Sequence, residues 1–223
     1  MIEIIKDLEK LSQRSDEVDT KKDNKLIRDT IVALKDIIRE KNLVYLTAPQ
    51  IDVPIRVFVI NFNNSLRSFV NPIISETKGF ELSREKCYSL DSEYIRPRAN
   101  NIKVMYQTPL GKLESRLMLG QAAIVFQHAV DHLDGLLLSD VGLEITEEFD
   151  KASEDERVEL IKMYIDSLDI KRKELEKEIE EDPELKQVSD AINFLESVQK
   201  GETVASIEDV KVKGNKIEVK EDG

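Results

Sequence analysis

The sequence contains very few residues that bind soft metal ions or form disulfides. Of its 223 residues, one is cysteine and two are histidine. A single cysteine excludes an internal disulfide, so we expect a reducing, cytoplasmic setting. No run of about 18 apolar residues is present, so no segment is predicted to span a bilayer. The N-terminal stretch MIEIIKD carries acidic side chains among its apolar ones, which argues against a signal peptide.

An excess of positive charge is also missing. The chain has 33 Lys and Arg against 45 Asp and Glu, a formal net charge of −12. Such a surface repels phosphate and anionic headgroups, so we expect neither a nucleic acid nor a membrane as a partner. Apolar residues make up 40% and charged residues 35%, as in a highly charged globular protein. The length allows one good-sized core, with or without an appendage.

The residues that are present predict a mixture of helices and strands. Helical spacing of apolar residues and a strongly apolar run predict two helices, at 23–41 and 120–133, the second ended by Gly135. Branched and aromatic residues predict a buried strand over 53–62. Asn71-Pro72 breaks the pattern that follows it. Shorter strands are expected at 73–76, 81–82, 101–107 and, as a hairpin partner, 112–117.

The composition changes after about residue 144, so we predict two domains, 1–145 and 146–223. Residues 146–181 are dense in acidic and basic side chains, with a sparse apolar stripe that predicts one long helix. Pro183 interrupts it, a second helix is expected over 184–200, and a β-hairpin is expected around Gly214-Asn215. This extension could dock a partner or self-associate, or it could only pack on its own domain.

The two histidines suggest a metal site. His128 and His132 are four residues apart, so on a helix they project from the same face. Cys87 is the obvious third ligand, and two His, one Cys and a water form an open catalytic arrangement. Gln127 and Asp131 flank the histidines and could orient them. The alternative is two ordinary hydrogen-bonded histidines beside a buried cysteine.

Three motifs, in order, resemble those of peptide deformylases. The family's Gly-x-Gly-Leu-Ala-Ala-Pro-Gln is similar to residues 43–50, LVYLTAPQ. Its Glu-Gly-Cys-Leu-Ser is similar to residues 85–89, EKCYS, and its Gln-His-Glu-x-Asp-His-Leu-x-Gly to residues 127–135, QHAVDHLDG. Residues 96–99, RPRA, and 69–72, FVNP, resemble two further segments of the family. The resemblance covers about residues 5–143. It implies an α+β fold with antiparallel sheets around a central metal-binding helix, here with a helical C-terminal extension.

The resemblance also implies a mechanism. Members bind one Fe²⁺, or Zn²⁺, Ni²⁺ or Co²⁺, through residues matching Cys87, His128 and His132. A metal-bound water removes the formyl group from the formyl-methionine that begins a peptide or nascent chain. The Gln50 side chain and the Tyr88 backbone N–H would hold the oxyanion. Arg98 would support the ligands from outside, and the peptide would pair as a strand along the cleft residues Val44, Tyr45 and Leu46.

One departure bears directly on activity. The family has a glutamate between the histidines that carries a proton from the water to the leaving amine, and this chain has Ala129 there. General acid–base catalysis is worth about 10²–10⁴-fold, so its loss should cripple hydrolysis. Leu43, Tyr45 and Lys86 replace family glycines as well, which favours natural divergence, bacterial or bacteriophage, over a single engineered change.

Three functions remain open from the sequence. The first is a deformylase with an altered or slow proton-transfer route. The second is a pseudoenzyme that keeps the metal for structure and docks partners through its extension. The third is a module that binds formylated or other N-termini without cleaving them.

Overall fold

The computed structural model describes residues 3–181, 210–213 and 216–219. The chain divides into two units, Met1–Ala152 and Ser153–Gly223. The helices of the first unit are α1 (Leu8–Leu11), α2 (Asn24–Lys41), the 3₁₀ turn η1 (Pro49–Ile51), α3 (Gln121–Asp134), α4 (Leu138–Val141) and α5 (Glu147–Lys151). Its strands are β1 (Tyr45–Thr47), β2 (Val57–Phe62), β3 (Ser65–Lys86), β4 (Glu93–Gln107), β5 (Leu113–Leu119) and β6 (Leu143–Ile145). The second unit contains α6 (Glu154–Glu181), β7 (Val210–Lys213) and β8 (Lys216–Val219).

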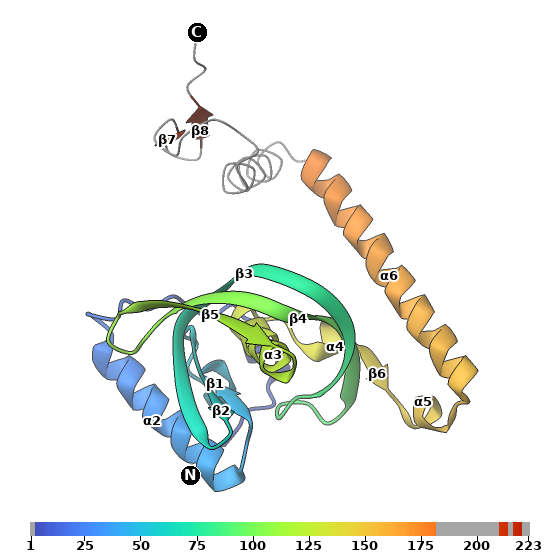
Figure 1. Cartoon of the computed structure of the whole chain (residues 1–223), viewed down its shortest axis with the longest axis horizontal. Coiled ribbons are helices and arrows are strands. Elements are labelled where there is room, and N and C mark those ends of the chain that lie inside the picture. The colour runs from blue at the N-terminus through green and yellow to red at the C-terminus, as the bar shows by residue number, and fades with distance from the viewer. Residues whose placement is uncertain (1–2, 182–209, 214–215, 220–223) are drawn as a thin grey trace. The chain divides into compact units, whose positions relative to one another are not determined.

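Strands β1 to β5 form one antiparallel sheet in chain order, and β6 pairs with β4. The long strands β3 and β4 curve around α3 (Figure 1). The predicted α+β class, with antiparallel strands around a central helix, is confirmed. Helix α3 is buried along most of its length, as its strongly apolar sequence predicted.

Strand β2 separates two cores because successive side chains of a strand point to opposite faces. Phe58 and Ile60 join the core around α3, whereas Val57 and Val59 join the core around α2. The register of β1 on β2 pairs Tyr45 with Ile60. Tyr45 therefore points toward α3, and its neighbour in β1 points toward α2.

The two predicted helices of this unit are present. Asp23 occupies the N-cap position of α2, and the helix buries its apolar stripe. Helix α3 ends where Gly135 adopts a left-handed conformation, with φ of 74°. An added Cβ at Gly135 would lie 2.4 Å from the backbone oxygen of Ser12, so only glycine fits this close approach.

The strand predictions need correction. The buried strand begins at Val57 rather than at 53, and the short strands expected between 73 and 107 are parts of the continuous β3 and β4. The interruption seen at Asn71-Pro72 is a bulge inside β3, where the register shifts between Val70 and Ile73. Asn71 has φ of 46° and donates its N–H to the carbonyl of Arg56. The bulge accommodates both this backbone and the missing N–H of proline.

The long helix predicted over 146–181 is two helices. Thr146 caps α5, accepting a hydrogen bond from the N–H of Phe149 at 3.2 Å. Ser153 and Glu156 then form a capping box that starts α6, with reciprocal bonds of 3.3 and 2.8 Å. The Ser-x-x-Glu spacing was visible in the sequence and predicts this start.

The predicted C-terminal hairpin is represented by β7 and β8, which pair antiparallel. Its turn at Gly214-Asn215 and the helix predicted over 184–200 lie outside the described residues. Among the described residues, no helix combines the length and hydropathy that a bilayer crossing requires.

Candidate metal centre

The structure brings Cys87, His128 and His132 together. Cys87 directly follows β3, and both histidines lie on α3, one turn apart. One ligand atom from each residue lies within 4.8 Å of the others, and all three residues are buried. The Sγ atom of Cys87 is 3.2 Å from Nε2 of His132. The sequence therefore identified all three members of this cluster.

A chain of buried charges orients His128. Its Nδ1 lies 2.8 Å from a carboxylate oxygen of Glu85, so Nε2 is the atom turned toward the cluster. Arg98 donates two hydrogen bonds to Glu85, at 2.7 and 3.0 Å, and one to Asp131 at 2.6 Å. Arg96 also donates to Asp131. The carboxylate–histidine pair fixes the ring, as outer partners of metal ligands commonly do.

These contacts set the protonation of the cluster. Burial raises the pKa of the Cys87 thiol, but hydrogen bonds with His128 and His132 outweigh burial and lower that pKa to about 5. Burial likewise raises the pKa of Glu85, but its bonds with His128 and Arg98 bring the pKa to about 2. At neutral pH the thiolate and the carboxylate are therefore both ionised. A thiolate is the form that binds metal ions.

Gln50 lies at the edge of the cluster, on η1. Its side-chain oxygen accepts hydrogen bonds from the backbone N–H and the hydroxyl of Thr47, at 3.1 and 3.0 Å. Its side-chain nitrogen donates to the Ser89 hydroxyl at 3.2 Å and lies 4.0 Å from Cys87 Sγ. Thr47 thus fixes the amide so that its N–H groups face the cysteine.

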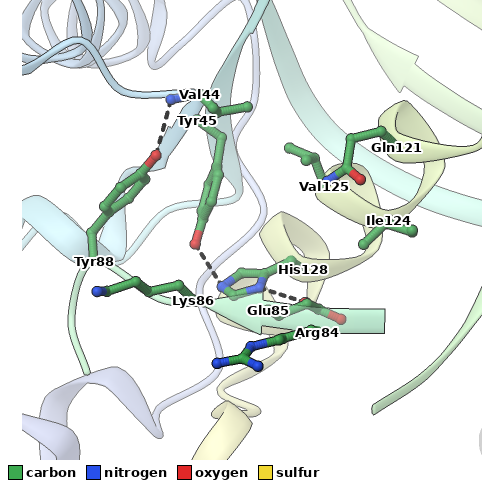
Figure 2. Close-up of a pocket in the computed structure, with 10 residues that line it drawn as sticks. All are labelled: Val44, Tyr45, Arg84, Glu85, Lys86, Tyr88, Gln121, Ile124, Val125 and His128. Atoms are coloured by element: carbon green, nitrogen blue, oxygen red, sulfur yellow. Dashed lines mark hydrogen bonds and ion pairs between the residues drawn. The ribbon is translucent and has the colours of Figure 1, made fainter. Parts of the chain in front are cut away.

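The cleft beside the cluster is narrow and partly filled by tyrosines (Figure 2). Its volume is about 140 Å³, and its lining includes Val44, Tyr45, Lys86, Tyr88 and His128. Lys86 is exposed and lies at this cleft. The sequence also predicted Leu46 as a cleft residue, but its side chain is fully buried in the core around α2.

Two tyrosines occupy the cleft. The Tyr88 hydroxyl accepts a hydrogen bond from the N–H of Val44 at 3.0 Å. The Tyr45 hydroxyl lies 2.6 Å from Nε2 of His128, the atom that faces the cluster (Figure 2). The Tyr45 ring lies 5.2 Å from that of Tyr88 and 4.9 Å from the imidazole of His128, between centroids.

Ala129 is fully buried between the histidines on α3. The nearby carboxylates are committed elsewhere, since Glu85 binds His128 and Arg98, and Asp131 binds Arg96 and Arg98. Within the described part of the chain, the contacts of Glu85 and Asp131 leave neither placed as a substitute for the missing glutamate.

The contacts of Gln127 and Asp131 differ from the orienting roles expected for them. Gln127 exchanges hydrogen bonds with the backbone of Ala99 at 3.1 and 2.7 Å, so it ties α3 to β4 rather than binding a histidine ring. Asp131 acts on His128 only through Arg98 and Glu85. The sequence left Glu85 without this orienting role, although its place two residues before the cysteine was a usable signal.

The donor set fits a divalent ion. Ligand atoms on one tetrahedral Zn²⁺, with bonds of about 2.0–2.3 Å, lie roughly 3.3–3.7 Å apart. The 3.2 Å between Cys87 Sγ and His132 Nε2 is close to such a spacing. Nδ1 of His132 is buried without a hydrogen-bond partner among the described residues. Nε2 of His132 is the ring nitrogen that faces the cluster, beside the Cys87 thiolate.

Several proteins of known family are similar to this chain in sequence. The family model for polypeptide deformylase matches residues 2–146. The peptide deformylase of Dictyoglomus turgidum is 34% identical over 60% of this chain and 84% of that protein. The match to the peptide deformylase of Karelsulcia muelleri, at 39% identity, covers 43% of this chain but only 54% of that protein.

Solved structures agree with the sequence comparison. The crystal structure of peptide deformylase from Thermotoga maritima is 31% identical, has a TM-score of 0.58, and is matched over 66% of this chain and 97% of that one. The Met-Ala-Ser-bound deformylase of Acinetobacter baumannii is 26% identical, with a TM-score of 0.59 over 63% of this chain and 98% of that one. With the family model matching well over half of its length, the chain belongs to the peptide deformylase family.

Proposed function

We propose that this protein holds one divalent metal ion at Cys87, His128 and His132 and deformylates formyl-methionyl peptides slowly or not at all. The observation that carries the proposal is the intact ligand cluster around a buried alanine at position 129. Fe²⁺ and Zn²⁺ are the candidate ions, with Ni²⁺ and Co²⁺ as alternatives, because thiolate and imidazole suit each of them. A reducing compartment such as the cytoplasm suits the free buried thiol of Cys87.

Part of the hydrolytic machinery is in place. The bound ion would supply a water of lowered pKa at the open position. The Gln50 amide, fixed by Thr47, would donate to the developing oxyanion together with the Tyr88 N–H. The missing part is a group that accepts the proton of the water and delivers it to the leaving amine. An alanine at 129 leaves that transfer to solvent, from which the site is largely shielded.

The size and lining of the cleft also disfavour the binding of a peptide. The Tyr88 hydroxyl already binds the backbone N–H of Val44, next to β1, the strand along which a peptide would pair. Ligand pockets usually measure about 300–1,000 Å³, whereas this cleft measures about 140 Å³. Tyr45, which replaces a family glycine, fills space where a peptide backbone would approach.

The second candidate is a structural or assembly protein that keeps the metal and no longer hydrolyses. The contact of Tyr45 with a ligand nitrogen favours it, because that contact obstructs the open position. In this candidate the extension at 146–223 docks a partner or a second copy. Comparing co-purified proteins with and without residues 153–223 tests this role, and an unchanged profile would exclude it.

Metal content tests the proposed site directly. We expect one divalent ion per purified chain, measured by elemental analysis. Cys87→Ser and His132→Ala should weaken binding by more than the roughly 10–100-fold typical of losing an outer partner. Glu85→Gln should fall within that smaller range, because Glu85 only orients His128. Lys103→Met, on the exposed part of β4, is the control and should leave binding unchanged. A chain without stoichiometric metal, or a silent Cys87→Ser, contradicts the proposal.

A further inference from the structure

We propose that Tyr45 supplies a fourth donor to the ion held by Cys87, His128 and His132, so that the protein encloses the ion by itself. This inference rests on the proposed metal site and goes beyond it, because the family position of Tyr45 is a glycine that offers no donor. It changes the character of the site. Four protein donors form a closed structural centre, whereas three donors and a water form a catalytic one.

The fold places the Tyr45 hydroxyl among the ligand atoms. Strand β1 pairs with β2 in a register that turns Tyr45 toward α3, and its side chain is 4% exposed. The hydroxyl lies 2.6 Å from Nε2 of His128 and also interacts with the thiol of Cys87. Figure 2 shows the oxygen beside the imidazole of His128.

The hydrogen bond of Tyr45 uses the nitrogen that an ion would take. Glu85 occupies Nδ1 of His128, so Nε2 is the nitrogen available to a metal. When an ion occupies Nε2, the buried hydroxyl loses this partner. Its remaining interaction would be the one with Cys87, itself a ligand of the proposed ion. An ion held by Cys87 and His128 would therefore lie beside the hydroxyl oxygen, which could act as its fourth donor.

The positive charge of the ion also favours the Tyr45 oxygen as a donor. Of the three donors only the Cys87 thiolate is anionic, so the donors themselves offset one of the two positive charges of a buried divalent ion. As a donor, Tyr45 would lose its O–H proton to solvent; the charge of the ion would favour this loss, whereas burial and the nearby Cys87 raise the pKa of Tyr45. The donor set would then carry two negative charges, from Cys87 and Tyr45, which match the charge of a divalent ion.

Ultraviolet difference spectra test whether Tyr45 binds the ion. Adding Zn²⁺ to the full chain freed of metal should produce the tyrosinate absorbance of one of its five tyrosines. Tyr45→Phe should lose this signal. Tyr106→Phe, a buried tyrosine whose hydroxyl binds Glu114, should keep it. One bound Zn²⁺ per chain without a tyrosinate signal in the wild type overturns the inference and leaves the metal site intact.

The second readout is the access of a small anion to the bound ion. It does not use Tyr45→Phe, so it stays informative if that variant fails to fold. With Co²⁺ bound, the visible spectrum of the wild type should not respond to azide, because no open position remains. Tyr45→Gly, which restores the family residue, should respond. Equal responses of the two proteins overturn the inference. Failure of both proteins to bind Co²⁺ overturns the proposed metal site as well, so the two failures are distinguishable.

Discussion

Hydrolysis of formyl-Met-Ala-Ser should rise by about 10²–10⁴-fold when Ala129→Glu is combined with Tyr45→Gly, the range that general acid–base catalysis supplies. The glutamate restores a proton carrier beside the ligands, and the glycine removes the hydroxyl that contacts His128 Nε2. Ala129→Glu alone should gain much less, because the buried carboxylate would compete with Tyr45 for the same space. The two changes should therefore be strongly non-additive.

A matched control separates proton transfer from cleft shape. Ala129→Gln with Tyr45→Gly has nearly the same volume but no ionisable group, so its rate should stay near that of Tyr45→Gly alone. Metal content must be equal across the series for the rates to be compared. Turnover by the unmodified chain equal to that of the double variant would contradict the proposed loss of activity.

Arg98→Met should destabilise the first unit by about 3–5 kcal/mol, the cost of leaving one member of a buried ion pair without its partner. The side chains of Arg98 and Glu85 are 3% and 5% exposed, and Arg98 also binds Asp131. Removing the guanidinium leaves the Glu85 carboxylate buried, with His128 as its remaining side-chain partner among the described residues. Urea denaturation of the full chain measures the change.

An exposed ion pair on the same strand provides the comparison. Lys103 binds Glu76 at 2.8 Å, and both side chains are about half exposed. Lys103→Met should cost only about 0–1 kcal/mol, as surface pairs do. Adding Glu85→Gln to Arg98→Met should recover part of the lost stability, because the unpaired charge is then absent. A cost of Arg98→Met no larger than that of Lys103→Met would contradict this account.

The three candidate ligands were predictable because residue type and spacing alone suggest a metal site. Two histidines four apart on a helix must share a face, and a single cysteine leaves no competing thiol. The strands were harder to predict, because Pro72 and Pro97 lie within β3 and β4, where prolines usually mark interruptions. The bulge near Asn71 and the register of the long hairpin depend on pairing between segments that are distant in sequence.

The sequence by itself determined the family, the three candidate ligands and the absence of the proton carrier, since each follows from which residue stands at which position. Only the tertiary structure decided what Tyr45 does. Whether a strand residue faces one core or the other depends on its register with a neighbouring strand, and a shift of one residue would exchange Tyr45 with Leu46. The observed register of β1 on β2 aims the Tyr45 hydroxyl at His128, while Glu85 turns the free nitrogen of that histidine toward it.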